Sequence, residues 1–530
     1  MGNISAGLRK QGAAAATDID STWDVVVIGG GITGAAVFCE AVRMGLKTLL
    51  LEQKDFAWGT SSRSSKMVHG GLRYLKQGKF MLTLASVRER QRLLSELPGL
   101  VDPLGFLMPV YSDHGPSRLA MGVGLSLYSL MAMEKQHKGY GPKQMAAMVP
   151  GLRTKKLSGG FYFKDAQVDD ARLVMRLIHE GADSGGVALN YTRVDDIGRD
   201  RRGRVAAVTA IDTDTGKTAE LYAPVVVNAT GAWADKLHPP PARGIHVRPL
   251  RGSHLIFPGS LFPLDRVVSF IHPADGRPVF IFPWEGTAVL GTTDVDHEPD
   301  LNMEPVITGG EADYLMEGLD FILPGLGISR EACIASIAGV RPVLGKGKVP
   351  ASKESREHMV WEQKGLVTVT GGKLTTFRLL ARDALAKARR YIPHGRPPLD
   401  SEPVFRVPDR MSEKTEESDL GVKRRLLGRY GALAGRVVEE SPRELVSTVG
   451  DTSTLWAELP FAARYEQVKH LSDLMLRRVR IGLLLPGGGE DILDKVESIC
   501  APFLSWDSDR WSDEKKRYTE EWHRAYAPPD

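Results

Sequence analysis

The sequence lacks a marked excess of either charge. Lysine and arginine number 69 and aspartate and glutamate 65 among 530 residues, so the net charge is only +4. Nucleic-acid binding depends on a basic surface, and this balance predicts none, so we expect no nucleic-acid partner. Cysteine is scarce as well: Cys39, Cys333 and Cys500 stand singly, without the spacing of a zinc site or a disulfide framework. We therefore predict no metal site and a reducing compartment.

Apolar runs long enough to cross a bilayer are missing too. One uncharged stretch stands apart, the 15 residues 119–133 (LAMGVGLSLYSLMAM) between Arg118 and Glu134. It predicts a helix, for which we favour burial inside the protein over an interfacial position on a membrane. Residues 1–21 have no apolar core of a secretory signal and are predicted to form a disordered tail, with an organelle-targeting segment as the weaker alternative.

A glycine-rich turn is the first chemical signal that is present. Gly29, Gly31 and Gly34 have the spacing G-x-G-x-x-G and stand between an apolar, β-branched run and a stretch with helical spacing. Such glycines allow a tight turn, close approach of a pyrophosphate and close packing of helix on strand. Glu52 ends the next strand, where an acid accepts hydrogen bonds from an adenosine ribose. The unit predicts a dinucleotide site and leaves FAD and NAD both open. Its strand, helix and second strand are predicted over residues 23–28, 33–44 and 47–51.

A second block, residues 60–75 (TSSRSSKMVHGGLRYL), combines hydroxyls, paired glycines and the cationic or titratable side chains of Lys66, His69 and Arg73. Small residues permit close approach to a flat ring, hydroxyls and amides can bind its edge, and cations can hold an anion beside it. The alternative is a polar loop that merely caps the next helix.

The length of 530 residues exceeds what one compact core holds, so two or three domains with a cleft are expected. Residues 223–231 and 367–373 are short apolar strands that end in glycine, as the first strand does, and we expect all three to meet at one cleft. Residues 278–284 and 288–291 indicate an antiparallel sheet. After residue 395, charged amphipathic segments predict a helical domain.

The motifs taken together closely resemble the FAD-dependent glycerol-3-phosphate dehydrogenases. They follow the family's order from about residue 22 to 390, and so long an ordered set is far more specific than any single member. The motifs are IGGGITG (28–34), HGGLRYL (69–75), DAQVDDARLV (165–174), NATGAW (228–233), RGSHLIF (251–257), GTTD (291–294), GVRP (339–342) and GGKLTTFR (371–378).

The resemblance implies an α/β fold with a glutathione-reductase-like, Rossmann-type FAD-binding domain, an antiparallel-sheet substrate domain and a C-terminal helical domain. It also implies oxidation of sn-glycerol 3-phosphate to dihydroxyacetone phosphate, with electrons passed through FAD to membrane quinone. The enzyme would be cytoplasmic and peripheral on a bacterial inner membrane, with a mitochondrial place less favoured and a homodimer left open. We predict the FAD-binding domain over 22–95, 160–244 and 335–395, the substrate domain over 96–159 and 245–334, and the helical domain over 396–530.

Oxidation of a secondary alcohol needs a hydride acceptor, which FAD supplies, and an acceptor for the hydroxyl proton. His254 and Arg341 are the candidates for the proton. Arginine stays protonated, so we assign proton acceptance to His254 and the holding of substrate oxygens to Arg341. By resemblance, Lys373 lies at the pyrimidine end of the flavin, where its charge stabilises the reduced ring. Phosphate binding is expected from Arg73 with Tyr74 and from Arg356.

The remaining site residues are expected to contact the cofactor. They are Gly29, Gly31, Gly34, Glu52, Thr60, Ser61, Ser65, Lys66, His69, Gly70, Gly71, Ala229, Thr230, Gly231, Gly372, Leu374, Thr375 and Thr376.

The acidic motif at 165–174 is left out of the catalytic set, because Asp169 or Asp170 is predicted to cap a helix that begins at Ala171.

The sequence departs from the family pattern at Arg251, where lysine is common, and at Phe377, where tyrosine is common. Both departures leave fine details of the pocket open. The basic patch of Arg477, Arg478 and Arg480 is predicted to lie on a solvated helix face or against anionic lipid.

Two other functions remain open. A glycerol-phosphate oxidase, or another amine or hydroxy-acid flavoenzyme of this fold, would pass electrons to oxygen instead of quinone. A non-catalytic dinucleotide-binding protein could sense redox state or scaffold a complex, although the joint presence of Arg73, His254, Arg341 and Lys373 argues against it.

Overall fold

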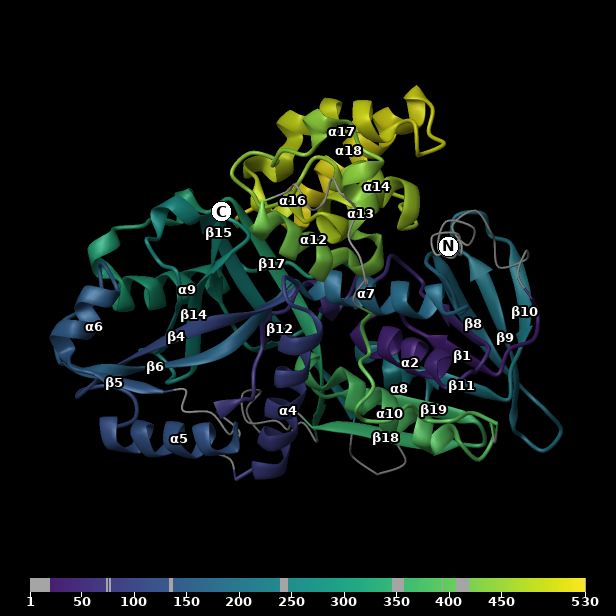
Figure 1. Ribbon diagram of the computed structural model, residues 1–530, viewed down its shortest axis with the longest axis horizontal. Coiled ribbons are helices and arrows are strands. Elements are labelled where there is room, and N and C mark those ends of the chain that lie inside the picture. The colour runs from purple at the N-terminus through teal and green to yellow at the C-terminus, as the bar shows by residue number, and fades with distance from the viewer. Residues whose placement is uncertain are drawn as a thin grey trace.

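The computed structural model describes residues 20–72, 75, 78–132, 137–238, 246–345, 357–392, 394–406 and 419–529. Among these residues the chain forms three sheets and a group of C-terminal helices (Figure 1). The predicted tail, apart from residues 20 and 21, lies outside the described residues.

The six-stranded sheet contains the predicted strand–turn–helix–strand unit, which is confirmed. Its inner strands run parallel, and only the edge strand β18 is antiparallel to its neighbour. The carboxyl ends of the parallel strands therefore lie at one edge, where ligands bind in open α/β sheets. In spatial order the strands are β18 (His358–Gln363), β19 (Leu366–Gly371), β11 (Val225–Asn228), β1 (Val25–Ile28), β2 (Thr48–Leu51) and β7 (Val187–Leu189).

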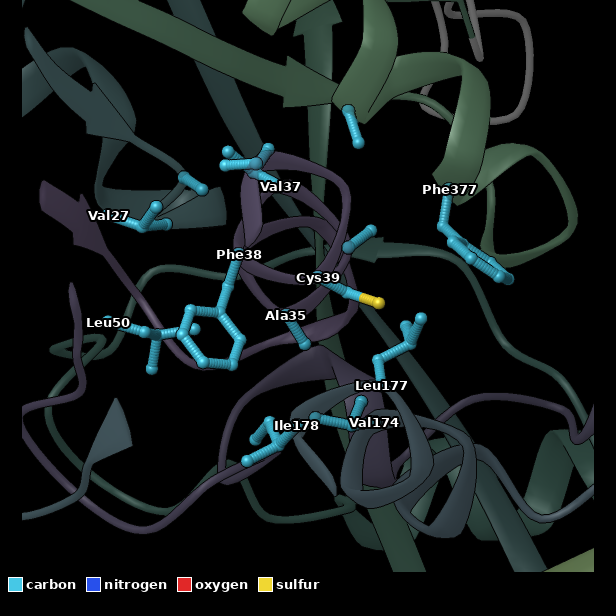
Figure 2. Packing of buried hydrophobic residues seen from close by; sticks show 14 of the residues in the cluster. Val27, Ala35, Val37, Phe38, Cys39, Leu50, Val174, Leu177, Ile178 and Phe377 are labelled. Atoms are coloured by element: carbon cyan, nitrogen blue, oxygen red, sulfur yellow. The ribbon is translucent and has the colours of Figure 1, made fainter. Parts of the chain in front are cut away.

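Both faces of this sheet are buried, which explains the uninterrupted apolar runs of its strands. On one face, helix α2 (Ile32–Arg43) packs its Phe38 toward Leu50 of the sheet, and its Cys39 points toward Leu177 of α7 (Asp170–Asp183) and Phe377 (Figure 2). On the other face lies a three-stranded antiparallel sheet, which shares a core with Val26 and Leu49. Its strands are β10 (Thr218–Tyr222), β9 (Val205–Asp212) and β8 (Thr192–Arg199).

The largest sheet is mixed but mostly antiparallel, and β13 with β4 is its parallel pair among the described residues. In order it contains β16 (Val295–Asp296), β12 (His246–Pro258), β15 (Thr287–Gly291), β14 (Pro278–Trp284), β13 (Val267–Ile271), β4 (Val101–Tyr111), β6 (Leu157–Val168) and β3 (Met67–Val68). In addition, β17 (Ala335–Gly345) pairs with β12 and β5 (Lys138–Tyr140) with β6.

Strand β17 belongs to this sheet, although the predicted FAD-binding domain includes residues 335–395. It pairs with β12 along its whole length, from Ala335 opposite Ile256 to Gly345 opposite His246. An apolar strand pattern does not specify which sheet a strand joins, and here long-range pairing decides it. The division into domains stays a prediction.

Helices cover the sheets and form the C-terminal unit, which Figure 1 shows gathered at one end of the molecule. Those before residue 400, besides α2 and α7, are α4 (Phe80–Glu96), α5 (Arg118–Met131), α6 (Pro142–Met148), α8 (Ala234–Leu237), α9 (Gly309–Ile322) and α10 (Phe377–Ala388). The C-terminal helices are α12 (Leu420–Tyr430), α13 (Ala434–Glu439), α14 (Glu458–Tyr465), α15 (Leu471–Asp473), α16 (Ile481–Leu484), α17 (Leu493–Cys500) and α18 (Ser508–Ala525), with a π-helical turn at Leu474–Arg478.

Helix α5 confirms the predicted helix, but the favoured prediction that its apolar side chains are buried inside the protein is wrong. Only Leu125, Tyr128 and Ser129 are buried, whereas Leu119 is 80% exposed and Leu130 75% exposed. An uncharged helix has the same sequence pattern whether its outer face packs against protein or is exposed to water, so the sequence does not decide between the two. No helix among the described residues is long and apolar enough to cross a membrane.

The basic patch of the C-terminal unit is also placed differently from the prediction. Arg477, Arg478 and Arg480 are at most 2% exposed, so they meet neither solvent nor lipid. Arg477 and Arg478 both donate to the carboxylate of Asp55, with the Arg478 nitrogens 2.7 Å from its two oxygens. Buried charges are tolerated only when paired, and these pairs fasten the C-terminal unit to the loop after β2.

Candidate functional site

The glycine turn after β1 has the geometry that the sequence predicts. Gly29 has φ +108°, and a Cβ there would lie 2.7 Å from the carbonyl oxygen of Ala229. A Cβ on Gly34 would lie 1.8 Å from the Gly29 carbonyl oxygen, so close helix–strand packing requires glycine. Gly31 is the N-cap of α2 and supplies no side-chain cap. The Ile32 N–H donates to the Ser61 hydroxyl at 2.9 Å, and the other amides of the first helical turn can bind an anion.

Glu52 lies at the carboxyl end of the neighbouring strand. Its Oε2 accepts from the Gly30 backbone N–H at 2.6 Å and its Oε1 from the Lys54 N–H at 2.9 Å. Each carboxylate oxygen keeps a second lone pair for a further donor. Burial raises the pKa of Glu52, while the two backbone donors oppose that rise.

The loop of residues 60–66 is clamped by groups distant in sequence. Lys66 Nζ donates to Asp170 at 2.9 Å, and both side chains are fully buried. Arg480 reaches in from the C-terminal unit and donates through Nη2 to the carbonyl oxygen of Ser62 at 2.7 Å. Burial and the neighbouring Arg480 charge lower the pKa of Lys66 to about 8, against the attraction of Asp170.

His254 lies on β12 with its ring against β15. A Cβ on Gly291 would lie only 2.1 Å from His254 Cδ2, so the glycine provides the space for the ring. His254 Nε2 is 2.9 Å from the hydroxyl oxygen of Ser65, and the residue is 1% exposed. Burial, then the charges of Arg341 and Lys66, hold the pKa of His254 well below its usual range. The imidazole is therefore neutral and has the protonation state of a base.

Arg341 also lies over a glycine, as His254 does. A Cβ on Gly252 would lie 2.1 Å from Arg341 Nη2, so a second glycine leaves room for the guanidinium. Arg341 Nη1 donates to Asp294 at 3.0 Å and Nη2 to the Thr292 hydroxyl at 2.9 Å. The arrangement places a fixed cation beside a neutral imidazole, which suits an oxygen-bearing substrate that must lose a proton.

The paired glycines of the second block are held by α5. The Gly70 N–H donates to the Tyr128 hydroxyl at 2.9 Å, and that hydroxyl donates to Asp165 Oδ1 at 2.9 Å. Arg90 Nη1 lies 2.5 Å from the same Asp165 oxygen. All these groups are buried, so the network holds the HGG segment against the inner face of α5.

The GGKLTT segment lies against the HGG segment. The His69 N–H donates to the Thr375 hydroxyl, which in turn donates to the His69 carbonyl oxygen. Lys373 Nζ donates to the Ser86 hydroxyl at 2.6 Å. Burial lowers the pKa of Lys373 to about 7, opposed by the charge of Asp165.

The structure thus brings two of the three predicted catalytic residues together and joins the HGG and GGKLTT segments. Arg73, Tyr74 and Arg356, the predicted phosphate-binding residues, lie outside the described residues. Ala229, Thr230 and Gly231 follow β11 beside the glycine turn, with Gly231 at φ +60°. Of the departures from the family pattern, Arg251 pairs with Glu311 and Phe377 is buried in the core.

Several residues of the site escaped the sequence analysis. The predicted cap is confirmed for Asp169, which accepts from the Arg172 N–H, but Asp170 binds Lys66 in the cofactor loop. The acidic pair in the 165–174 motif is the sequence signal for Asp170, but the motif does not show that the partner of this carboxylate is Lys66. No sequence pattern assigns Tyr128 or Arg480 to this site, because their partners lie 58 and 418 residues away.

A parallel sheet with a pyrophosphate turn, joined to a mixed sheet that carries a base and a cation, is typical of a dinucleotide-dependent oxidoreductase. Residues 24–386 match the family described as FAD dependent oxidoreductase. Residues 406–511 match the C-terminal domain of alpha-glycerophosphate oxidase.

Named relatives narrow the class. Glycerol-3-phosphate dehydrogenase 2 of Mycobacterium tuberculosis is 35% identical over 507 residues, covering 91% of this chain and 85% of that protein. The aerobic glycerol-3-phosphate dehydrogenase of Staphylococcus haemolyticus is 36% identical over 375 residues, covering 69% and 67%.

Solved structures agree with the relatives. The glycerol-3-phosphate dehydrogenase of Bacillus halodurans complexed with FAD has a TM-score of 0.77 and 26% identity, covering 98% of each chain. The L-alpha-glycerophosphate oxidase of Mycoplasma pneumoniae shares the fold at a TM-score of 0.57 and 18% identity, over 70% of this chain and 95% of that one. The chain belongs to the family of FAD-dependent glycerol-3-phosphate dehydrogenases. FAD, its predicted cofactor, and the predicted fold class are confirmed.

Proposed function

We propose that this protein oxidises sn-glycerol 3-phosphate to dihydroxyacetone phosphate and passes the electrons through FAD to a membrane quinone. The observation that carries the proposal is the neutral His254 beside the fixed Arg341 cation on a floor of two glycines. An alcohol must lose a proton as it loses a hydride, and its phosphate must be held by cations. The names of the relatives supply the particular alcohol.

The residues present fit FAD. The glycine turn with the start of α2 would hold the pyrophosphate, and Glu52 would accept from the ribose. The loop at 60–66 and the HGG and GGKLTT segments would enclose the ring, with Lys373 at its pyrimidine end. When bound, FAD supplies the acceptor for the hydride.

Substrate binding itself favours proton transfer to His254. The Arg341 charge is the second cause of the low His254 pKa, after burial. The negative charge of the bound phosphate would partly offset the charge of Arg341, so the imidazole would regain basicity when the substrate is present. We assign the phosphate to Arg73, Tyr74 and Arg356. Replacement of Arg73 by alanine should raise the apparent substrate constant by at least tenfold, because a bidentate contact to phosphate is lost.

Anaerobic spectroscopy tests the reaction. Addition of glycerol 3-phosphate to the holoenzyme under argon should bleach the flavin band, whereas glycerol or glycerol 2-phosphate should not. Protein that binds FAD but does not bleach would overturn the proposed substrate. Colourless protein that cannot be reconstituted with FAD would overturn the flavoenzyme proposal as a whole.

The electron acceptor needs a separate experiment, because the relatives include an enzyme named as an oxidase. The reduced enzyme should reoxidise rapidly with a soluble quinone analogue and slowly with oxygen. Rapid formation of hydrogen peroxide would replace the dehydrogenase proposal with the oxidase one.

We further propose a peripheral position on the cytoplasmic face of a bacterial inner membrane, with the outer face of α5 as the contact. Leu119, Val123 and Leu130 are 63–80% exposed on this helix, and Phe80 and Met81 at the start of the neighbouring α4 are exposed as well. So large an exposed apolar surface suits insertion at the headgroup boundary.

Flotation with vesicles of the anionic lipid phosphatidylglycerol tests this contact. The variant Leu119→Glu, Val123→Glu and Leu130→Glu should stay with the free protein, and Met303→Glu, at an exposed methionine elsewhere, should float as the parent does. Equal flotation of the triple variant would remove α5 from the proposal.

A further inference from the structure

We propose that Ser65 is a catalytic residue that relays the substrate hydroxyl proton to His254. The resemblance places Ser65 among the cofactor-binding residues, and the geometry adds this second role for its hydroxyl. The inference rests on the proposed function, because it assumes an alcohol substrate that is oxidised at the flavin.

Accessibility of the imidazole carries the inference. His254 is 1% exposed, and its Nδ1 is buried without a hydrogen-bond partner among the described residues. A nitrogen without accessible surface cannot receive a proton from a substrate. Only Nε2 remains, and it lies 2.9 Å from the Ser65 hydroxyl oxygen. Ser65 is itself partly exposed, unlike His254, so the proposal places its hydroxyl on the substrate side of the imidazole.

The position of Ser65 is set by its neighbours. The next residue, Lys66, has φ +56° and is held by Asp170 through a buried ion pair. Ser64 turns the other way, because its hydroxyl donates to Asp170 at 2.7 Å. The two adjacent serines therefore differ in function: one fastens the loop, and the other faces His254.

The charges around the imidazole fit a relay. Arg341 from β17 and Lys66 from the loop are the charged groups that act on His254, and both disfavour its protonated form. The imidazole is therefore neutral before the reaction. The low pKa means that His254 gives up its proton readily after turnover. The proton returns to solvent through the Ser65 hydroxyl, so the relay resets without a further residue.

The proposed step is balanced. As the hydride leaves carbon 2 of the substrate for FAD, the substrate O–H bond breaks and its proton passes to Ser65 Oγ. The Ser65 O–H bond breaks in the same step, and its proton passes to His254 Nε2. The substrate alcohol, oxidised by two electrons, becomes a ketone, and His254 becomes an imidazolium that later returns its proton to solvent through Ser65 Oγ.

The test compares Ser65→Ala, Ser65→Thr and Ser64→Ala with the parent holoenzyme under argon. Ser65→Ala should slow flavin bleaching by glycerol 3-phosphate by about 100-fold, within the usual range for loss of a proton-transfer group. Ser65→Thr keeps a hydroxyl and should recover most of the rate. Ser64→Ala disturbs the same loop without touching His254, so it controls for loosening of the loop.

Two readouts separate a relay from a structural role. The bleaching rate in mixtures of light and heavy water should report two moving protons in the parent and a different dependence in Ser65→Ala. Imidazole nitrogen NMR of the FAD-bound protein without substrate, assigned with His254→Asn, should show the Nε2 resonance shift in Ser65→Ala and remain unchanged in Ser64→Ala.

The outcomes distinguish the two proposals. Absence of bleaching in the parent would remove the proposed substrate. The relay would be overturned if the parent bleaches and Ser65→Ala bleaches equally fast with the same isotope dependence. That result would leave the proposed function intact. Slow bleaching that comes with loss of FAD, and that Ser65→Thr does not restore, would also overturn it and leave Ser65 as a cofactor ligand.

Discussion

Substitution of Gly291 by alanine should slow the chemical step by displacing His254. The new Cβ would lie 2.1 Å from His254 Cδ2, whereas ordinary contact between carbon atoms begins at about 3.4 Å. The ring must therefore retreat by about 1.3 Å, which also breaks its 2.9 Å contact with Ser65. A misplacement of about 1 Å in an active site can cost about 100-fold in rate, and we expect a loss of that size.

Stopped-flow measurement of flavin reduction by saturating glycerol 3-phosphate is the assay, with FAD content measured on the same samples. FAD content should be unchanged, because Gly291 lies on β15 of the largest sheet, whereas the glycine turn follows β1 of the six-stranded sheet. The matched control is Gly310→Ala on α9, where an added Cβ meets nothing within 4 Å. This control should keep the parent rate and gain up to about 1 kcal/mol of stability. A parent-like rate in Gly291→Ala would refute the placement of His254 in the chemistry.

Three further predictions follow from other contacts. Gly252→Ala should push the Arg341 guanidinium off its floor and raise the substrate constant at least tenfold in steady-state kinetics, and an unchanged constant would separate Arg341 from the substrate. Asp55→Asn should lower the free energy of unfolding in urea by about 3 kcal/mol, because Arg477 and Arg478 lose a buried partner. Asp195→Asn, in an exposed ion pair, should change it by less than about 0.5 kcal/mol, and equal losses in the two variants would contradict the reasoning. Lys373 has a depressed pKa of about 7, so the unfolded chain binds this proton more tightly than the folded protein does. The free energy of unfolding of the FAD-free protein should therefore rise with pH between about 7 and 10.5, by at most about 1.4 kcal/mol per pH unit. Lys373→Met should flatten that slope, and a slope as steep as the parent's would rule out the depressed pKa.

The glycine turn was predictable because its chemistry is local. Gly29, Gly31, Gly34 and Glu52 lie within one short strand–helix–strand unit, and the steric demands on them come from the backbone of that unit and the strand beside it. Their spacing therefore carries the function without knowledge of the rest of the fold. The same reasoning explains the accurate bounds of β1, α2 and β2.

The catalytic floor was predictable only in part. His254 and Arg341 were named from motifs that resemble a family, and no spacing in the sequence shows that they share a surface. Pairing of β12 with β15 and β17 brings them together, with Gly291 and Gly252 beneath them. Ser65 was expected at the cofactor, and only the position of its hydroxyl beside Nε2 points to a proton path.

The sequence by itself determined the dinucleotide turn, the buried parallel strands and, through ordered motifs, the family. Tertiary structure alone decided which apolar and charged side chains are covered. The outer face of α5 looked like core and is exposed, whereas Arg477, Arg478 and Arg480 looked like surface and are buried. The physical reason is that burial depends on partners: Asp55 is more than 400 residues from the arginines that it binds, and no local pattern encodes such a pair.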